Sequence, residues 1–167
     1  LPFLRGRPVV LVRHPDGIHG KSFFQWNVPR GTPDWIRKLS LRDPDDPSHD
    51  KSVFLVDDVE SLLYIVNLGC IPLHVLACRE ASVSECDFIT IDLDLGEQPF
   101  PRAVEIALTL REILDDAELQ GFPKTSGQGG LHLLVPLGPG VPFEAGKLLV
   151  ELIGGLATAR HSDFATM

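Results

Sequence analysis

Apolar and polar positions along the chain follow two spacings, one typical of strands and one typical of helices. Runs of apolar and β-branched residues predict strands at 8–13, 52–56, 71–77 and 88–94, and two more near 122–125 and 131–136. Apolar residues at helical spacing predict helices at about 59–68, 101–119 and 143–158. Asp34 could also cap a short helix at 35–40. This order predicts an α+β fold, in which helices pack on one side of a mixed β-sheet.

The segments between these elements are rich in residues that favour turns. Residues 14–34 are predicted to form a loop, interrupted by Phe23-Phe24-Gln25-Trp26, and residues 42–51 a solvated loop. Either Asp57 or Asp58 is expected to cap the helix at 59–68, and Gly69 to end it.

Composition limits the class of protein. A length of 167 residues predicts one domain, and no stretch approaches the roughly 18 apolar residues of a membrane helix. The three cysteines show no CxxC spacing, so we expect reduced thiols in a cytoplasm rather than disulfides or a zinc site. The net charge of −8 disfavours a passive nucleic-acid binder. It leaves open an enzyme whose acidic site is bridged to substrate phosphates by cations.

The predicted strand at 88–94 ends in two aspartates. Asp92 and Asp94 are two positions apart, so an extended strand places both carboxylates on one face, while Ile91 and Leu93 point into the core. Paired carboxylates suit two Mg²⁺ or Mn²⁺ ions that bridge a triphosphate and activate a hydroxyl. A solvated strand end remains open as an alternative. So does a phosphatase of the haloacid dehalogenase type, although Leu95-Gly96 and the mid-chain position differ from its usual pattern.

A glycine-rich loop joins the last two predicted strands. Backbone N–H groups of such loops can converge on an anion, and the side chains of Lys124, Thr125, Ser126 and Gln128 add donors. His132 opens the following strand and could donate to a phosphate oxygen. The loop lacks the Walker pattern. A glycine-rich hairpin with a chance histidine is the alternative.

Four segments together resemble the primase-polymerase domain of bacterial ligase D, in the archaeo-eukaryotic primase superfamily. They are GRPVVLVRHPDGIHGKSFFQ, NLGCIPLH, DFITIDLDLG and KTSGQGGLHLLVPL, and the resemblance covers essentially the whole chain. It implies the catalytic core of that superfamily, in partial form.

The resemblance also implies roles for individual residues. Asp92 and Asp94 would bind two Mn²⁺ or Mg²⁺ ions, and Ser126 and His132 would contact the incoming nucleoside triphosphate. His74 would lie near the nucleotide sugar. The aromatic residues Phe23 and Phe24 would contact the template strand.

The chain departs from the family pattern at several positions. Trp26 stands where the family often has lysine, Gly129 where it often has a basic residue, and Leu95 where it usually has proline. A third acidic ligand with nearby triphosphate-binding arginines, and N-terminal lysines that recognise a 5′-phosphate, are not found. We therefore expect a piece of a longer protein, truncated at both ends.

The function implied by the resemblance is metal-dependent addition of nucleotides to DNA ends during non-homologous end joining. Its implied partners are gapped or 5′-phosphorylated duplex DNA, an ATP-dependent ligase domain in the same parent protein and a Ku-type end-binding protein, in a bacterial cytoplasm at the nucleoid. A catalytically incomplete fragment or a non-catalytic nucleotide- or DNA-binding module is the alternative.

Overall fold

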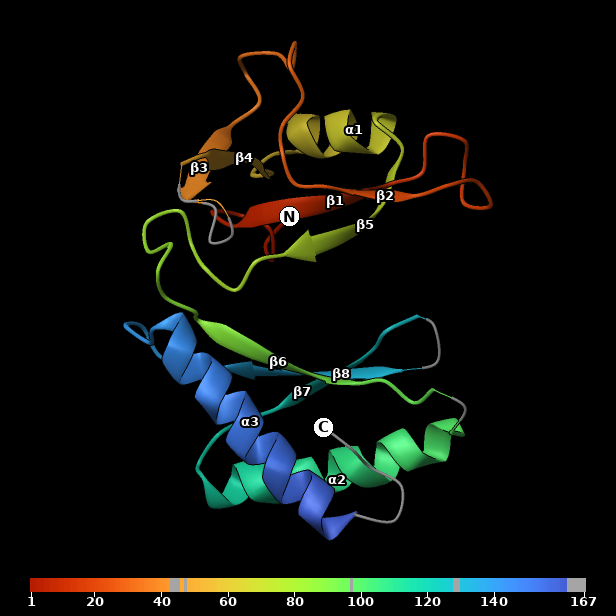
Figure 1. Ribbon diagram of the computed structural model, residues 1–167, viewed down its shortest axis with the longest axis vertical. Helices are drawn as coiled ribbons and strands as arrows, with labels where there is room; N and C mark the ends of the chain where they lie inside the picture. The colour runs from red at the N-terminus through yellow and green to blue at the C-terminus, as the bar shows by residue number, and fades with distance from the viewer. Residues whose placement is uncertain (43–45, 47, 97, 128–129, 162–167) are drawn as a thin grey trace. The chain divides into compact units, whose positions relative to one another are not determined.

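The chain forms two compact units, and each is described by itself. The computed structural model describes residues 1–42, 46, 48–96, 98–127 and 130–161. The first unit spans Leu1–Val83 and the second Ser84–Met167. Figure 1 labels the helices and strands of both units. That the two units form one domain, as the length predicts, stays a prediction.

The first unit contains a five-stranded antiparallel sheet and one helix. Its strands are β1 (Pro8–Arg13), β2 (Phe23–Gln25), β3 (Lys38–Arg42), β4 (Asp50–Leu55) and β5 (Cys70–Val75), and its helix is α1 (Val59–Asn67). One edge of β1 pairs with β5. The other edge pairs with β4 near the start of β1 and with β2 near its end. β3 pairs with β4, so β1 is the central strand of this sheet.

Helix α1 covers one face of this sheet (Figure 1). Val9 and Leu11 of β1, Phe54 of β4 and Ile65 of α1 are completely or almost completely buried in one cluster. Burial of such side chains contributes roughly 1.5–3 kcal/mol each. Asp58, not Asp57, caps the helix: its carboxylate accepts a hydrogen bond from the Ser61 N–H at 2.7 Å, which lowers the pKa of Asp58.

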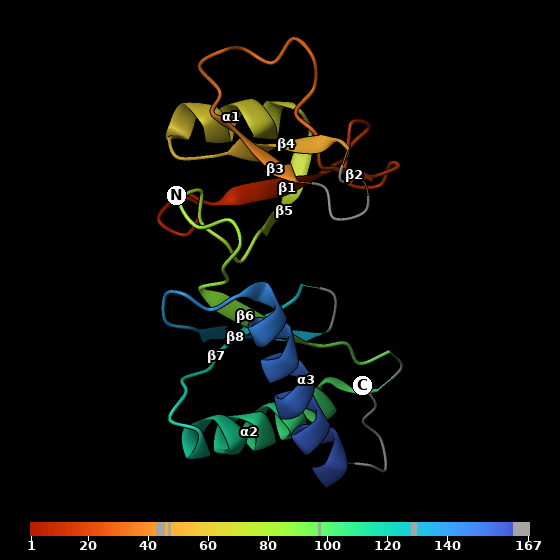
Figure 2. The ribbon, with the colours of Figure 1, turned by 60° about the vertical axis from the view of Figure 1, so that its left-hand side comes forward.

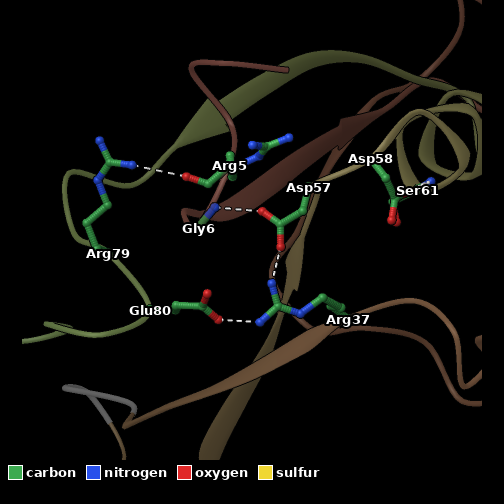
Figure 3. A network of polar contacts seen from close by, with 8 residues as sticks. All are labelled: Arg5, Gly6, Arg37, Asp57, Asp58, Ser61, Arg79 and Glu80. Atoms are coloured by element: carbon green, nitrogen blue, oxygen red, sulfur yellow. Dashed lines mark hydrogen bonds and ion pairs between the residues drawn. The ribbon is translucent and has the colours of Figure 1, made fainter.

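Asp57 belongs instead to a polar network that joins distant parts of the first unit (Figure 3). It accepts a hydrogen bond from the Gly6 N–H at 2.6 Å and also binds the guanidinium of Arg37. The same guanidinium donates to Glu80 at 2.6 Å, and the hydrogen bonds to Glu80 and Asp57 raise the pKa of Arg37. Because the Arg37 side chain is 50% exposed, water screens these pairs, and their role is chiefly to fix the chain path.

The second unit contains a three-stranded antiparallel sheet and two helices. In spatial order its strands are β6 (Phe88–Leu93), β8 (Leu131–Pro136) and β7 (Phe122–Thr125), and its helices are α2 (Phe100–Asp116) and α3 (Phe143–Arg160). Both helices lie on the same side of the sheet (Figures 1 and 2). A Cβ atom on Gly146 of α3 would lie 3.3 Å from the Ile89 side chain, so α3 packs closely against β6.

The α+β class and most elements predicted from the sequence are confirmed, with three corrections. The helix predicted at 35–40 is wrong, because Lys38–Arg42 forms β3 and pairs along its whole length with β4. Asp50 and Lys51, expected in a loop, begin β4. The strands form two sheets rather than one, and the strand pairs of the described residues are antiparallel.

The cysteines Cys70, Cys78 and Cys86 are buried. Burial raises the pKa of the Cys70 thiol. Among the described residues, none of the helices combines the length and the apolar character needed to cross a membrane.

We predict that Gly69→Ala destabilises the protein more than Gly31→Ala does. Both glycines have left-handed backbones, with φ of +76° and +83°. Only at Gly69 would the added Cβ also meet backbone, 3.0 Å from the His14 carbonyl oxygen, while Gly31 faces open space. Gly31→Ala therefore measures the backbone cost alone, about 1 kcal/mol, and Gly69→Ala should cost roughly 2–3 kcal/mol in urea unfolding. Equal losses would show that the His14 contact is unimportant.

Candidate functional site

The register of the second sheet places three polar side chains in one row. Asp92 of β6 lies opposite His132 of β8, and His132 lies opposite Lys124 of β7. Residues that lie directly opposite each other in antiparallel strands point to the same face. We call Asp92, His132 and Lys124 the cross-strand row.

The neighbouring residues point to the other face, toward the helices. Ile91, Leu133 and Val135 are buried, whereas the residues of the cross-strand row are exposed or half-buried. The alternation therefore separates an apolar face, packed by α2 and α3, from the face of the cross-strand row, which neither α2 nor α3 covers and which we call the polar face (Figure 2).

Asp92 and His132 form an ion-pair contact within the row. The His132 Nε2 atom lies 3.4 Å from the Asp92 Oδ1 atom, slightly beyond an ordinary hydrogen bond. The Asp92 side chain is 65% exposed and that of His132 is 33% exposed. Both groups are thus accessible to a ligand, and the imidazole can donate to an anion beside the carboxylate.

Asp94 follows directly after β6 and is exposed. Together with Asp92 it supplies carboxylate oxygens, the donors that Mg²⁺ and Mn²⁺ prefer, so the pair fits a divalent ion by chemistry. Among the residues that the structure describes, no three His, Cys, Asp or Glu side chains are placed to hold one metal together.

The hairpin between β7 and β8 is fixed beside the end of β6. The Ser126 N–H donates to the Gly130 carbonyl, and the Gly130 N–H donates to the Ser126 hydroxyl, both at 3.0 Å. A Cβ atom on Gly130 would lie 3.0 Å from the Leu93 carbonyl oxygen and 3.1 Å from the Ser126 hydroxyl. A side chain at this position would therefore have to displace the Leu93 carbonyl or the Ser126 hydroxyl.

The other residues predicted in this loop differ in how far they can be placed. Lys124 and Thr125 are exposed at the end of β7, where the Lys124 ammonium donates to the Thr125 carbonyl at 3.0 Å. Gln128 lies outside the described residues. The second unit thus brings together Asp92, His132 and Lys124 in a row, with Ser126 at the adjacent hairpin.

The first unit brings together the aromatic pair and His74. The Phe24 ring lies 5.3 Å from the His74 ring, between centroids, and Phe24 is 62% exposed. Phe23 is exposed on the other side of β2, where the Arg13 guanidinium lies 5.4 Å from its ring centroid. Phe23 and Phe24, which were predicted to act as a pair, thus lie on opposite sides of β2 and have different contacts.

Two cationic residues of this region were not predicted from the sequence. Arg13 binds the Leu68 carbonyl at 2.7 Å and the Gln25 side chain at 2.8 Å, and it thereby orders β2. Lys51 lies with its ammonium 5.2 Å from the Trp26 ring centroid. The sequence hints at a role for Arg13, because it is a charged residue at the end of the apolar run PVVLVR. It contains no such hint for Lys51, which stands in a segment expected to be loop.

A cavity of about 590 Å³ lies on the apolar face of the second sheet, between α2 and the β7–β8 hairpin. Its walls include Val104, Leu108, Pro123 and Leu133. Arg111 and Asp115 also line it and pair with each other at 3.6 Å. Apolar walls suit neither a triphosphate nor a metal, so we place the candidate site on the polar face.

Comparison with known proteins agrees with this fold. The model of the LigD primase-polymerase domain matches residues 1–167. The bifunctional non-homologous end joining protein LigD of Bacillus subtilis is 33% identical over 99% of the chain, which spans 26% of that protein. The multifunctional non-homologous end joining protein LigD of Pseudomonas aeruginosa is 39% identical over 80% of the chain, corresponding to 16% of its own length.

A solved structure is similar over nearly the whole chain. The polymerase domain of Mycobacterium tuberculosis ligase D, in complex with DNA, has a TM-score of 0.88 and 25% identity. The match covers 99% of this chain and 60% of the solved chain. By sequence and by fold, the chain belongs to the LigD primase-polymerase domain family.

Proposed function

We propose that the chain carries the nucleotide site of a metal-dependent nucleotidyltransferase that fills or extends DNA ends in non-homologous end joining. The observation that supports this best is the cross-strand row on the polar face, with Asp94 at the end of the same strand as Asp92. The Asp92 carboxylate suits a metal ion, and the Lys124 ammonium in the same row suits a phosphate. A metal-bound nucleoside triphosphate brings both.

Asp92 and Asp94 would hold Mn²⁺ or Mg²⁺, two ions in the complete site. When bound, the ions would activate a 3′-hydroxyl for attack on the α-phosphate and neutralise the charge of the leaving pyrophosphate. Two carboxylates that lie close together repel each other without a cation, so a pair two residues apart is suited to binding one.

The remaining residues of the row and hairpin would bind the triphosphate. His132, at 3.4 Å from Asp92, would donate to a phosphate oxygen next to the metal. Lys124, across β8 from Asp92, would add a positive charge farther along the triphosphate. Ser126, with Thr125 and Gln128, would contribute hydroxyl and amide donors at the hairpin.

The residues of the first unit would bind the sugar and the DNA. We assign His74 to the nucleotide sugar, and Phe24, with Phe23, to the template strand. The exposed face of Phe24 and its contact with His74 support this, because stacking on an accessible ring tolerates any base.

The partners follow from the relatives. We propose gapped or 5′-phosphorylated duplex DNA and ribonucleoside or deoxyribonucleoside triphosphates as substrates. A ligase domain in the same parent protein and a Ku-type end-binding protein would be partners, in a bacterial cytoplasm. The names of the relatives, which describe a bifunctional and a multifunctional end-joining protein, and the solved polymerase domain bound to DNA support this.

A second candidate is a nucleotide- or DNA-binding module without catalysis. It is favoured by the ligand count, because within the described ranges Asp92 and Asp94 have no third His, Cys, Asp or Glu beside them. Such a module would bind a nucleotide with Mn²⁺ but would not extend a primer.

We predict that Asp92→Asn abolishes primer extension on a gapped duplex in Mn²⁺. Loss of a residue outside the metal's own ligands typically costs 10–100-fold, so loss of a ligand should cost at least about 100-fold. Asp116→Asn, an exposed aspartate at the end of α2, is the matched control and should leave extension unchanged.

Two results would separate the candidates. If the wild-type chain extends the primer and Asp92→Asn extends it equally well, then Asp92 is not a metal ligand. Calorimetric binding of Mn²⁺ and nucleotide that depends on Asp92, without any extension, would favour the binding module.

We also predict that Gly130→Ala weakens nucleotide binding or extension by roughly tenfold. The added Cβ must push apart the Leu93 carbonyl and the Ser126 hydroxyl, and small displacements of catalytic groups carry large rate costs. Gly138→Ala, where a Cβ meets open space, is the control and should have no effect. Equal activity of the two variants would mean that the hairpin need not lie against the acidic strand.

A further inference from the structure

Arg13, the last residue of β1, contacts both the end of α1 and the short strand β2. Its Nε atom donates to the Leu68 carbonyl at 2.7 Å, and its Nη1 atom donates to the Gln25 side chain at 2.8 Å. Its guanidinium also lies 5.4 Å from the centroid of the Phe23 ring. One half-buried side chain thus joins the helix to the first and last residues of β2.

The Leu68 carbonyl is a firm attachment point for this arginine. Leu68 is the C-terminal cap residue of α1, and carbonyl groups at the end of a helix lack a partner within the helix. The partial negative charge of a helix C-terminus also favours a cation there. Because Ile65 of α1 is buried in the core of the first unit, the position of the helix end is fixed by packing.

The hydrogen bonds that begin at Arg13 continue from β2 to β4. The Gln25 Nε2 atom donates to the Asn27 carbonyl at 3.0 Å, and the Asn27 side chain accepts from the Ser52 N–H at 3.0 Å. Residues 23–27 are therefore held between α1 and β4 by one chain of hydrogen bonds.

The strand β2 depends on these contacts because its own pairing is short. It lies at the edge of the sheet, and its three residues pair with residues 11–13 of β1. Pairing over so few residues is weak by itself. We therefore expect the position of β2 to change when Arg13 is lost.

The ring of Phe24 lies on the opposite face from the Arg13 guanidinium. Arg13 is directly opposite Phe23, and the next residue along β2 points to the other face. There the Phe24 ring lies 5.3 Å from the His74 ring and is 62% exposed. A ring that is mostly exposed has few contacts of its own, so its position follows from the backbone that carries it.

We infer that Arg13 is a positioning residue for the template strand: it holds β2 from the face opposite Phe24, so that the Phe24 ring lies beside His74. The inference rests on the proposed function for the assignment of Phe24 to the template. A direct contact with a DNA phosphate is the other role open to an arginine. The contacts favour positioning, because Arg13 directs two of its N–H groups at oxygen atoms of the protein itself.

Binding of a labelled duplex with a single-stranded template overhang, measured in EDTA, separates the two roles. Phe24→Ala should weaken binding about tenfold, and Arg13→Gln about fivefold. Arg13→Lys should weaken it as much as Arg13→Gln, because an ammonium lacks the fork of donors that reaches both oxygen atoms. Arg42→Gln, an exposed arginine at the end of β3, is the matched control and should bind like wild type.

Three further readouts distinguish positioning from a phosphate contact or a general loss of structure. Arg13→Gln should keep the salt dependence of wild type, whereas loss of one phosphate contact would lower the slope of log affinity against log salt by about 0.7. In the Phe24→Ala background, Arg13→Gln should have no further effect, because it acts through that ring. Binding of a blunt duplex should be equal in wild type and Arg13→Gln.

A second variant protects the test against misfolding of Arg13→Gln. Gln25→Met removes the acceptor on β2 but leaves the bond from Arg13 to Leu68. It should weaken overhang binding about threefold, and urea unfolding would verify that it is folded.

Several results would overturn the inference. They are wild-type overhang binding by Arg13→Lys or by folded Gln25→Met, a lower salt slope in Arg13→Gln, additive losses in the double variant of Arg13 and Phe24, and equal weakening of blunt-duplex binding.

Failure here is distinguishable from failure of the proposed function. Asp92→Asn should bind the overhang like wild type in EDTA, because its proposed role is in metal binding. Primer extension that requires Asp92, together with wild-type overhang binding by Arg13→Gln, would refute only the positioning role. Overhang binding that depends on Arg13 and Phe24, without any extension by the wild-type chain, would refute only the polymerase assignment.

Discussion

The register of three short antiparallel strands determines where every side chain of the second sheet points. Asp92, His132 and Lys124 share one face because they lie opposite one another, and Ile91 and Leu133 share the other face for the same reason. A slip of one residue would exchange the two sets, burying the charges against the helices. The apolar contacts with α2 and α3 therefore fix the polar row as firmly as they fix the core.

Much of the fold could be predicted from local patterns, since β1, α1, β6 and α3 follow apolar runs or helical spacing within a few residues. The failures have a common physical origin. Lys38–Arg42 alternates polar and apolar residues over only five positions, and the helix cap expected at Asp34 outweighed this short signal. The segment is a strand because all five residues pair with β4. The division into two sheets likewise depends on strand partners, which no local pattern specifies.

The parts of the candidate site that lie within one strand or one hairpin could be predicted from the sequence. The two-residue spacing predicts a common face for Asp92 and Asp94, and β6 contains the first of them and ends at Leu93. The glycine-rich loop indicated a hairpin before His132, and β7 and β8 form it. The pairing of Asp92 with His132 needs the register, and the contact of Trp26 with Lys51 needs β2 and β4 to meet beside β1. Neither contact could be predicted from a single sequence, because each joins residues at least 25 positions apart along the chain.

Anomalous X-ray scattering from crystals grown with Mn²⁺ and a nucleoside triphosphate would test the central claim most directly. The claim is that the polar face of the second sheet binds metal and triphosphate together. It predicts a manganese peak about 2.1 Å from carboxylate oxygens of both Asp92 and Asp94, with phosphate oxygens at His132. Manganese and triphosphate bound elsewhere, with both aspartates in contact with water alone, would contradict it.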